Sequence, residues 1–156
     1  MTLGELMNID SGRQTKAAGC SVELVKIYHE VNSEAIPDNL KSSFGGRNMI
    51  NIYNVIFKFI VTSDSGKKHV VFIKTNPSAD WENNTAEVYC DCEDFKYRSA
   101  YTLENSKSLF QNDKTKLSLG QALTTPPKRT PNLLCKHAYA AVKWLISNYT
   151  NLIKTI

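Results

Sequence analysis

Four residues of this 156-residue chain have the types and spacing that bind a metal ion. Cys90 and Cys92 are separated by one residue, as are Cys135 and His137, and 42 residues lie between the two pairs. Zn²⁺ prefers thiolate and imidazole ligands, and three cysteines with one histidine complete a closed tetrahedral set. We therefore predict that Cys90, Cys92, Cys135 and His137 bind one structural zinc ion.

Two other interpretations of these residues are open, namely free thiols and a catalytic zinc. A disulfide between Cys90 and Cys92 would be strained at this spacing, which favours a metal. A catalytic zinc needs an open coordination position and a general base. The nearby acids Asp91, Glu93 and Asp94 are better explained as solvated or capping residues. We therefore expect a binding or assembly protein and not an enzyme.

The elements that must position the four residues can be read from hydrophobic patterning. Residues 51–62 and 69–75 are rich in β-branched and aromatic side chains and predict a hairpin, and residues 85–90 predict a third strand that ends at Cys90. Residues 134–152 have helical periodicity, so Cys135 and His137 fall at a helix start, where thiolate charge is stabilised. The expected fold is α+β: a small antiparallel sheet of about three strands, packed on a C-terminal helix and held by zinc.

The remaining segments are expected to be less regular. We predict a polar N-terminal arm over residues 1–20 and one zinc-held domain over residues 21–156. Within that domain, residues 22–31 favour a short helix, although their β-branched content would also suit a strand. Residues 37–48 predict a loop, and residues 94–101 predict a short helix capped by Asp94. Residues 102–131 contain several prolines and are expected to form a long inserted loop.

This order of two strands, C-x-C, and then C-x-H on a helix resembles the SWIM zinc finger. The resemblance covers roughly residues 51–150 and depends on CDC at 90–92, CKH at 135–137 and the following AYAAVKWL. It implies one zinc on a ββα fold, although the spacer is longer than the family's usual one. The segment CDCEDFKYRSAY, with the Pro-rich insertion and CKHAYA, also resembles small SWIM-type proteins of tailed bacteriophages, which implies a virion component.

Positive charge is concentrated beside the predicted metal site. The chain has a net charge of +4, but residues 1–93 have three more acidic than basic residues, whereas residues 94–137 have five more basic than acidic ones. A basic surface of this kind can meet an acidic protein or nucleic-acid phosphates. The candidate contact residues are Lys96, Arg98, Lys128, Arg129 and Lys136. A phosphate-binding face would add Lys107, Lys114 and Lys116.

Two hypotheses for function follow. The first is a structural or assembly protein with protein partners, which includes a virion component. The second is a nucleic-acid-binding zinc finger that uses the basic 94–137 region. We expect synthesis in the cytoplasm, no membrane contact because no run of 18 apolar residues occurs, and no small-molecule substrate because phosphate-loop and hydrolase motifs are absent.

The other notable side chains are expected to be structural. His29 and His69 have no ligand-spaced neighbours, and Cys20 stands alone. Trp81 and Trp144 are interpreted as packing anchors. Phe95 and Tyr97 cannot share one helical face, so one of them is expected to pack under the zinc site.

Overall fold

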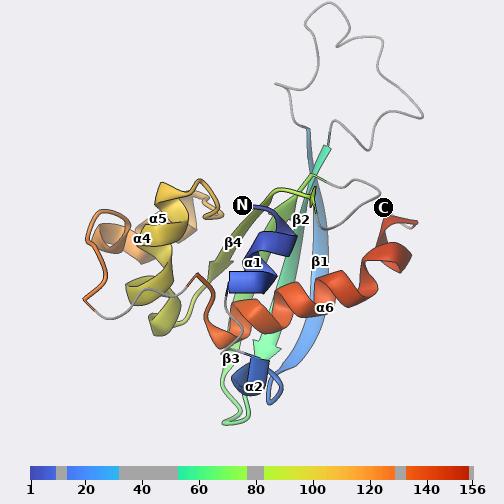
Figure 1. The fold of residues 1–156 in the computed structure, drawn as a ribbon, viewed down its shortest axis with the longest axis horizontal. Coiled ribbons are helices and arrows are strands. Elements are labelled where there is room, and N and C mark those ends of the chain that lie inside the picture. Colours follow the sequence, from blue (N-terminus) through green and yellow to red (C-terminus); the bar gives the residue numbers. More distant parts are fainter. Residues whose placement is uncertain (10–13, 32–52, 77–82, 129–132, 155–156) are drawn as a thin grey trace, which may run out of the picture.

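The computed structural model describes residues 1–9, 14–31, 53–76, 83–128 and 133–154. The centre of the fold is an antiparallel sheet in the order β1 (Ser21–Val31), β2 (Tyr53–Thr62), β3 (Lys68–Thr75) and β4 (Ala86–Cys90). Helix α6 (Lys136–Ile153) lies across one face of this sheet (Figure 1). The predicted α+β class and the C-terminal helix are confirmed, but the sheet has four strands and not three.

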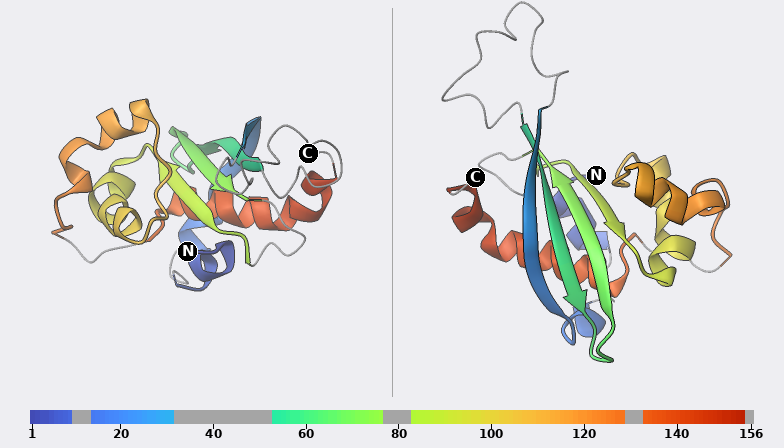
Figure 2. Two further views of the ribbon diagram at one scale, coloured as in Figure 1. Left: turned by 90° about the horizontal axis from the view of Figure 1, so that it is seen from above. Right: turned by 180° about the vertical axis from the view of Figure 1, so that it is seen from behind.

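Shorter helices complete the fold on two sides of the sheet. Helices α1 (Leu3–Ile9) and α2 (Gln14–Ala17) lie on the same side as α6. A group of short helical segments lies beyond the β4 edge (Figure 2). They are η5 (Phe95–Ser99), α4 (Ala100–Asn105), α5 (Asp113–Leu119) and η6 (Gly120–Leu123). None of the helices in the described ranges is long and apolar enough to cross a bilayer.

The core lies between the sheet and α6. Alternate residues of β2 are buried beneath the helix, because successive side chains of a strand point to opposite faces. The Phe59 and Trp144 rings meet edge to face at 5.5 Å, as expected of a packing anchor. The buried residues that β2 and α6 contribute are Val55, Phe57, Phe59, Val61, Ala138, Tyr139, Ala140, Ala141, Val142, Leu145 and Tyr149.

The prediction of a short helix over residues 22–31 is wrong, because this segment forms β1. It pairs with β2 over its whole length, and the register shifts between Leu24 and Lys26. An extra residue in a β-bulge interrupts the two-residue alternation of side chains. Leu24 and Ile27 therefore both pack against the core, and their three-residue spacing imitates a helix. Pairing with β2 decides the conformation here.

The prediction of a polar arm over residues 1–20 is also wrong for the described part of that segment. Leu3 and Leu6 of α1 are fully buried in the core. The helix begins with a reciprocal cap, in which the Glu5 amide donates to Thr2 Oγ1 at 3.1 Å and the Thr2 amide donates to Glu5 Oε1 at 3.3 Å. This Thr-x-x-Glu pattern is a recognisable sequence signal for a helix start.

The predicted long loop over residues 102–131 contains helices instead. Helix α5 begins at Asn112, whose side chain accepts from the Thr115 amide while Thr115 Oγ1 accepts from the Asn112 amide, both at 2.8 Å. Leu103 and Leu119 are buried, so this region has its own apolar contacts. Asp94 does not cap the helix through its side chain; it forms an ion pair with Arg98 at 3.2 Å.

Some predictions lie outside the described residues. They are the loop over residues 37–48, the packing role of Trp81, and the contact role of Arg129. Each stays a prediction.

Candidate metal centre

The first pair of candidate ligands lies where β4 ends. Cys90 is the last residue of β4 and pairs with Val71 of β3. The Asp91 amide donates to the Val70 carbonyl at 3.2 Å, so the chain stays beside β3 for one more residue. Cys92 then precedes the helical segment, and its sulfur accepts the Phe95 amide at 3.3 Å. The backbone turn after β4 therefore brings both thiols to one place.

The second pair lies at the start of α6, as the sequence predicts. Cys135 is the N-cap residue, and its sulfur accepts the Ala138 amide at 3.4 Å. His137 follows in the first turn. Amide groups directed at sulfur, together with the positive end of a helix dipole, stabilise thiolate charge. The start of α6 is thus suited to hold an anionic metal ligand.

These four side chains form the Cys₃His cluster: Cys90, Cys92, Cys135 and His137. Their ligand atoms all lie within 4.8 Å of one another, and all four residues are buried. Tetrahedral zinc with bonds of about 2.0–2.3 Å places its ligands roughly 3.3–3.8 Å apart, so a small contraction would complete the shell. The arrangement therefore fits a metal ion.

The histidine supports the same conclusion. His137 Nδ1 lies 4.0 Å from the Cys135 sulfur. Its Nε2 atom is buried and has no hydrogen-bond partner among the described residues. Buried polar atoms are almost always paired in folded proteins, so a buried imidazole beside three thiols is suited to a ligand role.

The electrostatics of the cluster explain why a cation would be favourable. Burial raises the pKa of the Cys90 and Cys135 thiols well above the ordinary value. The pKa of Cys92 is lowered, chiefly because the Cys135 and Cys90 thiols donate hydrogen bonds to its sulfur. Three thiolates packed together without a cation would repel one another. A bound dication would stabilise all three.

Sequence reasoning missed two residues that lie beside the cluster. The His69 ring contacts the His137 ring, with centroids 4.1 Å apart and planes tilted by 37°, and His69 Nδ1 lies 3.1 Å from Asp91 Oδ1. Strand register brings them there: because Val71 pairs with Cys90, the antiparallel arrangement places the start of β3 beside residues 91–92, and no local sequence signal reports this pairing. His69 is therefore an outer-layer neighbour of the site and not an isolated strand residue.

The predicted contact residues are divided between two places. Lys96, Arg98 and Lys128 line one cleft between η5 and the segment after η6. Lys136 lies elsewhere, with its ammonium 4.0 Å from the Asp64 carboxylate in the turn between β2 and β3. Of the aromatic pair, Phe95 is fully buried and packs against Tyr89, whereas Tyr97 is 60% exposed.

The fold and the cluster together define an α+β protein with a buried Cys₃His group that could hold a metal ion. No protein-family model matches the chain, and comparison with curated proteins and with solved structures finds no match either. The chemistry of the site therefore rests on its own geometry.

Proposed function

We propose that this chain is a zinc-stapled, SWIM-like interaction module that serves as a structural part of a protein assembly. The observation that supports zinc most directly is the closure of the Cys₃His cluster, whose ligand atoms lie within 4.8 Å of one another. Three sulfurs and one imidazole favour Zn²⁺ over the hard cations Mg²⁺ and Ca²⁺, which bind oxygen.

A structural role follows from where the ligands come from. When bound, the zinc ion would supply coordination bonds that tie the end of β4 and its following turn to the start of α6. These segments are about forty residues apart in the sequence. The helical region 93–128 lies between them in the chain, so it begins just after the first ligand pair and comes before the second. A metal cross-link at this point would hold the helical region against the sheet, and its binding free energy would add to the free energy of folding.

Catalysis is disfavoured by the same closure. A catalytic zinc keeps one coordination position for water or substrate, whereas here four protein ligands would fill the shell. Cys92 and His137 are the most accessible members, and each is only 6% exposed. Asp91, the acid that lies between two of the ligands in the sequence, is hydrogen-bonded to His69. We therefore propose a non-enzymatic protein.

A protein partner is favoured over nucleic acid by the distribution of charge. The cleft that contains Lys96 and Lys128 also contains the carboxylates of Glu93 and Asp94, and Lys136 lies near Asp64. Phosphate binding depends on several cations that act together on one face, and mixed charge weakens it. The resemblance to SWIM-type phage proteins extends the proposal to a virion component as one such assembly.

Metal analysis of purified, reduced protein tests the zinc proposal. Wild type should contain one zinc per chain by elemental mass spectrometry, and Cys135→Ser should lose it. Cys20→Ser is the matched control, because Cys20 is a free cysteine outside the cluster and its loss should leave the metal in place. Wild type without zinc, or Cys135→Ser with full zinc content, would overturn the proposal.

A titration with single- and double-stranded oligonucleotides at two salt concentrations separates the two partner classes. Nucleic-acid binding would weaken steeply with salt, because each neutralised phosphate releases counterions. We expect weak binding at low salt and none near physiological ionic strength. Tight binding with a steep salt slope would favour the nucleic-acid alternative.

A further inference from the structure

A cleft of about 650 Å³ follows the candidate metal ligand Cys92 in the chain and is lined by residues from the 93–98 and 121–128 segments. Its volume falls within the range of cavities that bury a ligand or a short peptide segment. The Cys₃His cluster is not part of it, and the zinc site does not explain it.

Tyr97 gives the cleft an exposed aromatic surface. The side chain is 60% exposed, and Lys96 Nζ lies 5.3 Å from the centre of its ring. Pro126 and Pro127 line the same cleft. Exposed tyrosines beside rigid prolines are favourable contact surfaces because little conformational entropy is lost on binding. The π-helical turn that carries Tyr97 is also a feature found frequently at functional sites.

The charges of the cleft select the kind of partner. Lys96, Arg98 and Lys128 contribute three cations, and Glu93 and Asp94 contribute two carboxylates. Arg98 and Asp94 form an ion pair at 3.2 Å, which leaves Lys96 and Lys128 as the dominant cations. A net excess of one positive charge, together with the Tyr97, Pro126 and Pro127 side chains in the lining, matches an apolar segment that has a few carboxylates. A run of phosphates would instead meet Glu93.

The segment that contains Tyr97 is held by a candidate metal ligand. The Phe95 amide donates to the Cys92 sulfur at 3.3 Å, and the Lys96 amide donates to the Cys92 carbonyl at 3.2 Å. Phe95 is fully buried, so it fixes the segment from the core side while Tyr97 points outward. The position of Cys92 in the candidate metal centre therefore fixes the position of the segment that contains Tyr97.

From these observations we infer that the cleft binds an extended acidic peptide segment of a protein partner. An aliphatic or proline side chain of that segment would lie between Tyr97 and Pro126–Pro127, with a carboxylate against Lys96 or Lys128. The inference rests on the proposed function in one respect, that the partner is a protein.

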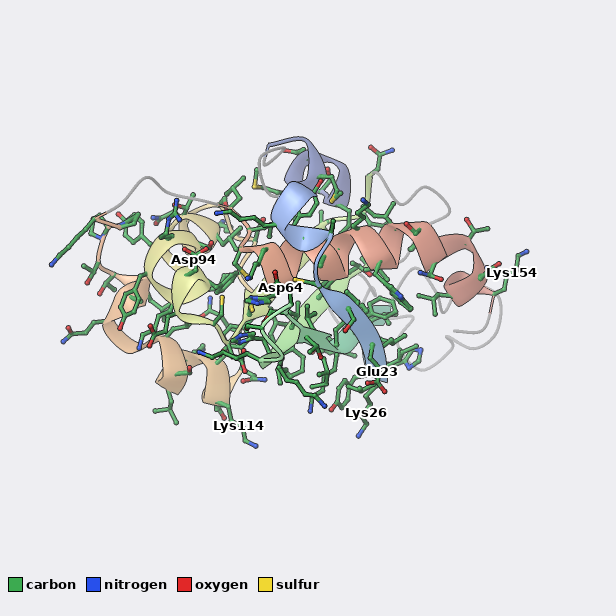
Figure 3. All side chains as sticks on the ribbon, turned by 90° about the horizontal axis from the view of Figure 1, so that it is seen from below. Glu23, Lys26, Asp64, Asp94, Lys114 and Lys154 are labelled. Carbon is green, nitrogen blue, oxygen red and sulfur yellow. The ribbon has the colours of Figure 1, made fainter. Side chains whose placement is uncertain are left out.

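Selection of displayed 12-residue random peptides on the zinc-loaded full chain tests the inference. The enriched peptides are then measured by fluorescence anisotropy against two pairs of variants. Tyr97→Ala and Lys96→Glu change the cleft. Leu117→Ala and Lys114→Glu make comparable changes on α5, where Leu117 is 84% exposed and Lys114 lies well away from Asp94 (Figure 3).

We expect enriched peptides to combine Asp or Glu with Leu, Ile or Pro, and to bind Tyr97→Ala and Lys96→Glu about tenfold more weakly or worse. The two α5 variants should bind as wild type does. Peptides that bind all four variants equally, a selection without enrichment, or an oligonucleotide that competes at the cleft would each overturn the inference. Zinc content is measured separately, so a chain without zinc that still binds acidic peptide through Tyr97 would refute only the zinc proposal.

Discussion

At the scale of single residues, His69 and Asp91 form a second layer around the metal centre. Asp91 lies between two candidate ligands in the sequence, and its carboxylate holds His69 at 3.1 Å. The His69 ring in turn covers the His137 ring. Hydrogen-bond partners of metal-binding imidazoles fix the ring orientation, and their loss commonly weakens metal binding about 10- to 100-fold, whereas His69 contacts His137 ring to ring.

We expect His69→Ala to lower zinc affinity by up to about tenfold, because His137 would lose a ring contact and not a hydrogen-bond partner, whose loss costs about 10- to 100-fold. Competition with a chromophoric chelator measures this change, and Co²⁺ substitution reports whether the tetrahedral site persists. His29→Ala, on the exposed part of β1, is the control. Equal zinc affinity in His69→Ala and wild type would show that His69 does not position His137.

At the scale of elements, α1 is an integral part of the core. The Leu3 amide donates to the Asn84 carbonyl and the Ala86 amide donates to the Met1 carbonyl, both at 2.9 Å, so the N-terminal residues continue the hydrogen bonding of β4. Nearby, the buried Asn84 side chain donates to the Tyr149 hydroxyl at 2.8 Å. The residues at the start of β4 are thereby joined both to the N-terminal segment and, through Asn84, to the far end of α6.

Leu6→Ala should lower the free energy of unfolding by about 2–5 kcal/mol, because it leaves a cavity in a fully buried position. Leu117→Ala removes the same atoms from a side chain that is 84% exposed and should change stability by less than about 0.5 kcal/mol. Urea unfolding of the zinc-loaded proteins compares the two. Similar losses in both variants would argue against the buried placement of α1.

At the scale of the whole molecule, stability has two sources at different places. The β1–β2–β3 part rests on long antiparallel pairing and on the apolar layer beneath α6. The helical region beyond β4 returns to the sheet at the Cys₃His cluster. Figure 1 shows these two parts side by side, with β4 between them.

Metal removal should therefore loosen the molecule unevenly. With a chelator present, amide hydrogen exchange should rise first in η5, α4 and the first turns of α6, because these segments depend on the cluster. The β2–β3 hairpin should keep most of its protection. Hydrogen exchange measured by mass spectrometry resolves these segments. A uniform rise across the sheet and the helical region would contradict a locally acting metal, and so would no change.

The candidate ligands, the hairpin and the C-terminal helix could all be predicted from residue types and their spacing. The C-x-C and C-x-H pairs report their chemistry through residue type and spacing, which are local properties. The hydrophobic periodicity of residues 134–152 is also local, and it indicates which face of α6 is apolar without reference to the rest of the chain. The capping pattern at Thr2 and Glu5 is local as well, so the start of α1 is also encoded in the sequence alone.

Tertiary structure decided the rest, because those features depend on pairing between distant segments. The bulge at Val25 depends on β2, and without that partner the spacing of Leu24 and Ile27 suits a helix equally well. The place of His69 depends on the β3–β4 register. The lysines that share a cleft are decided by the way the 93–128 region folds. The number of charges along a sequence does not show toward which surface each side chain points.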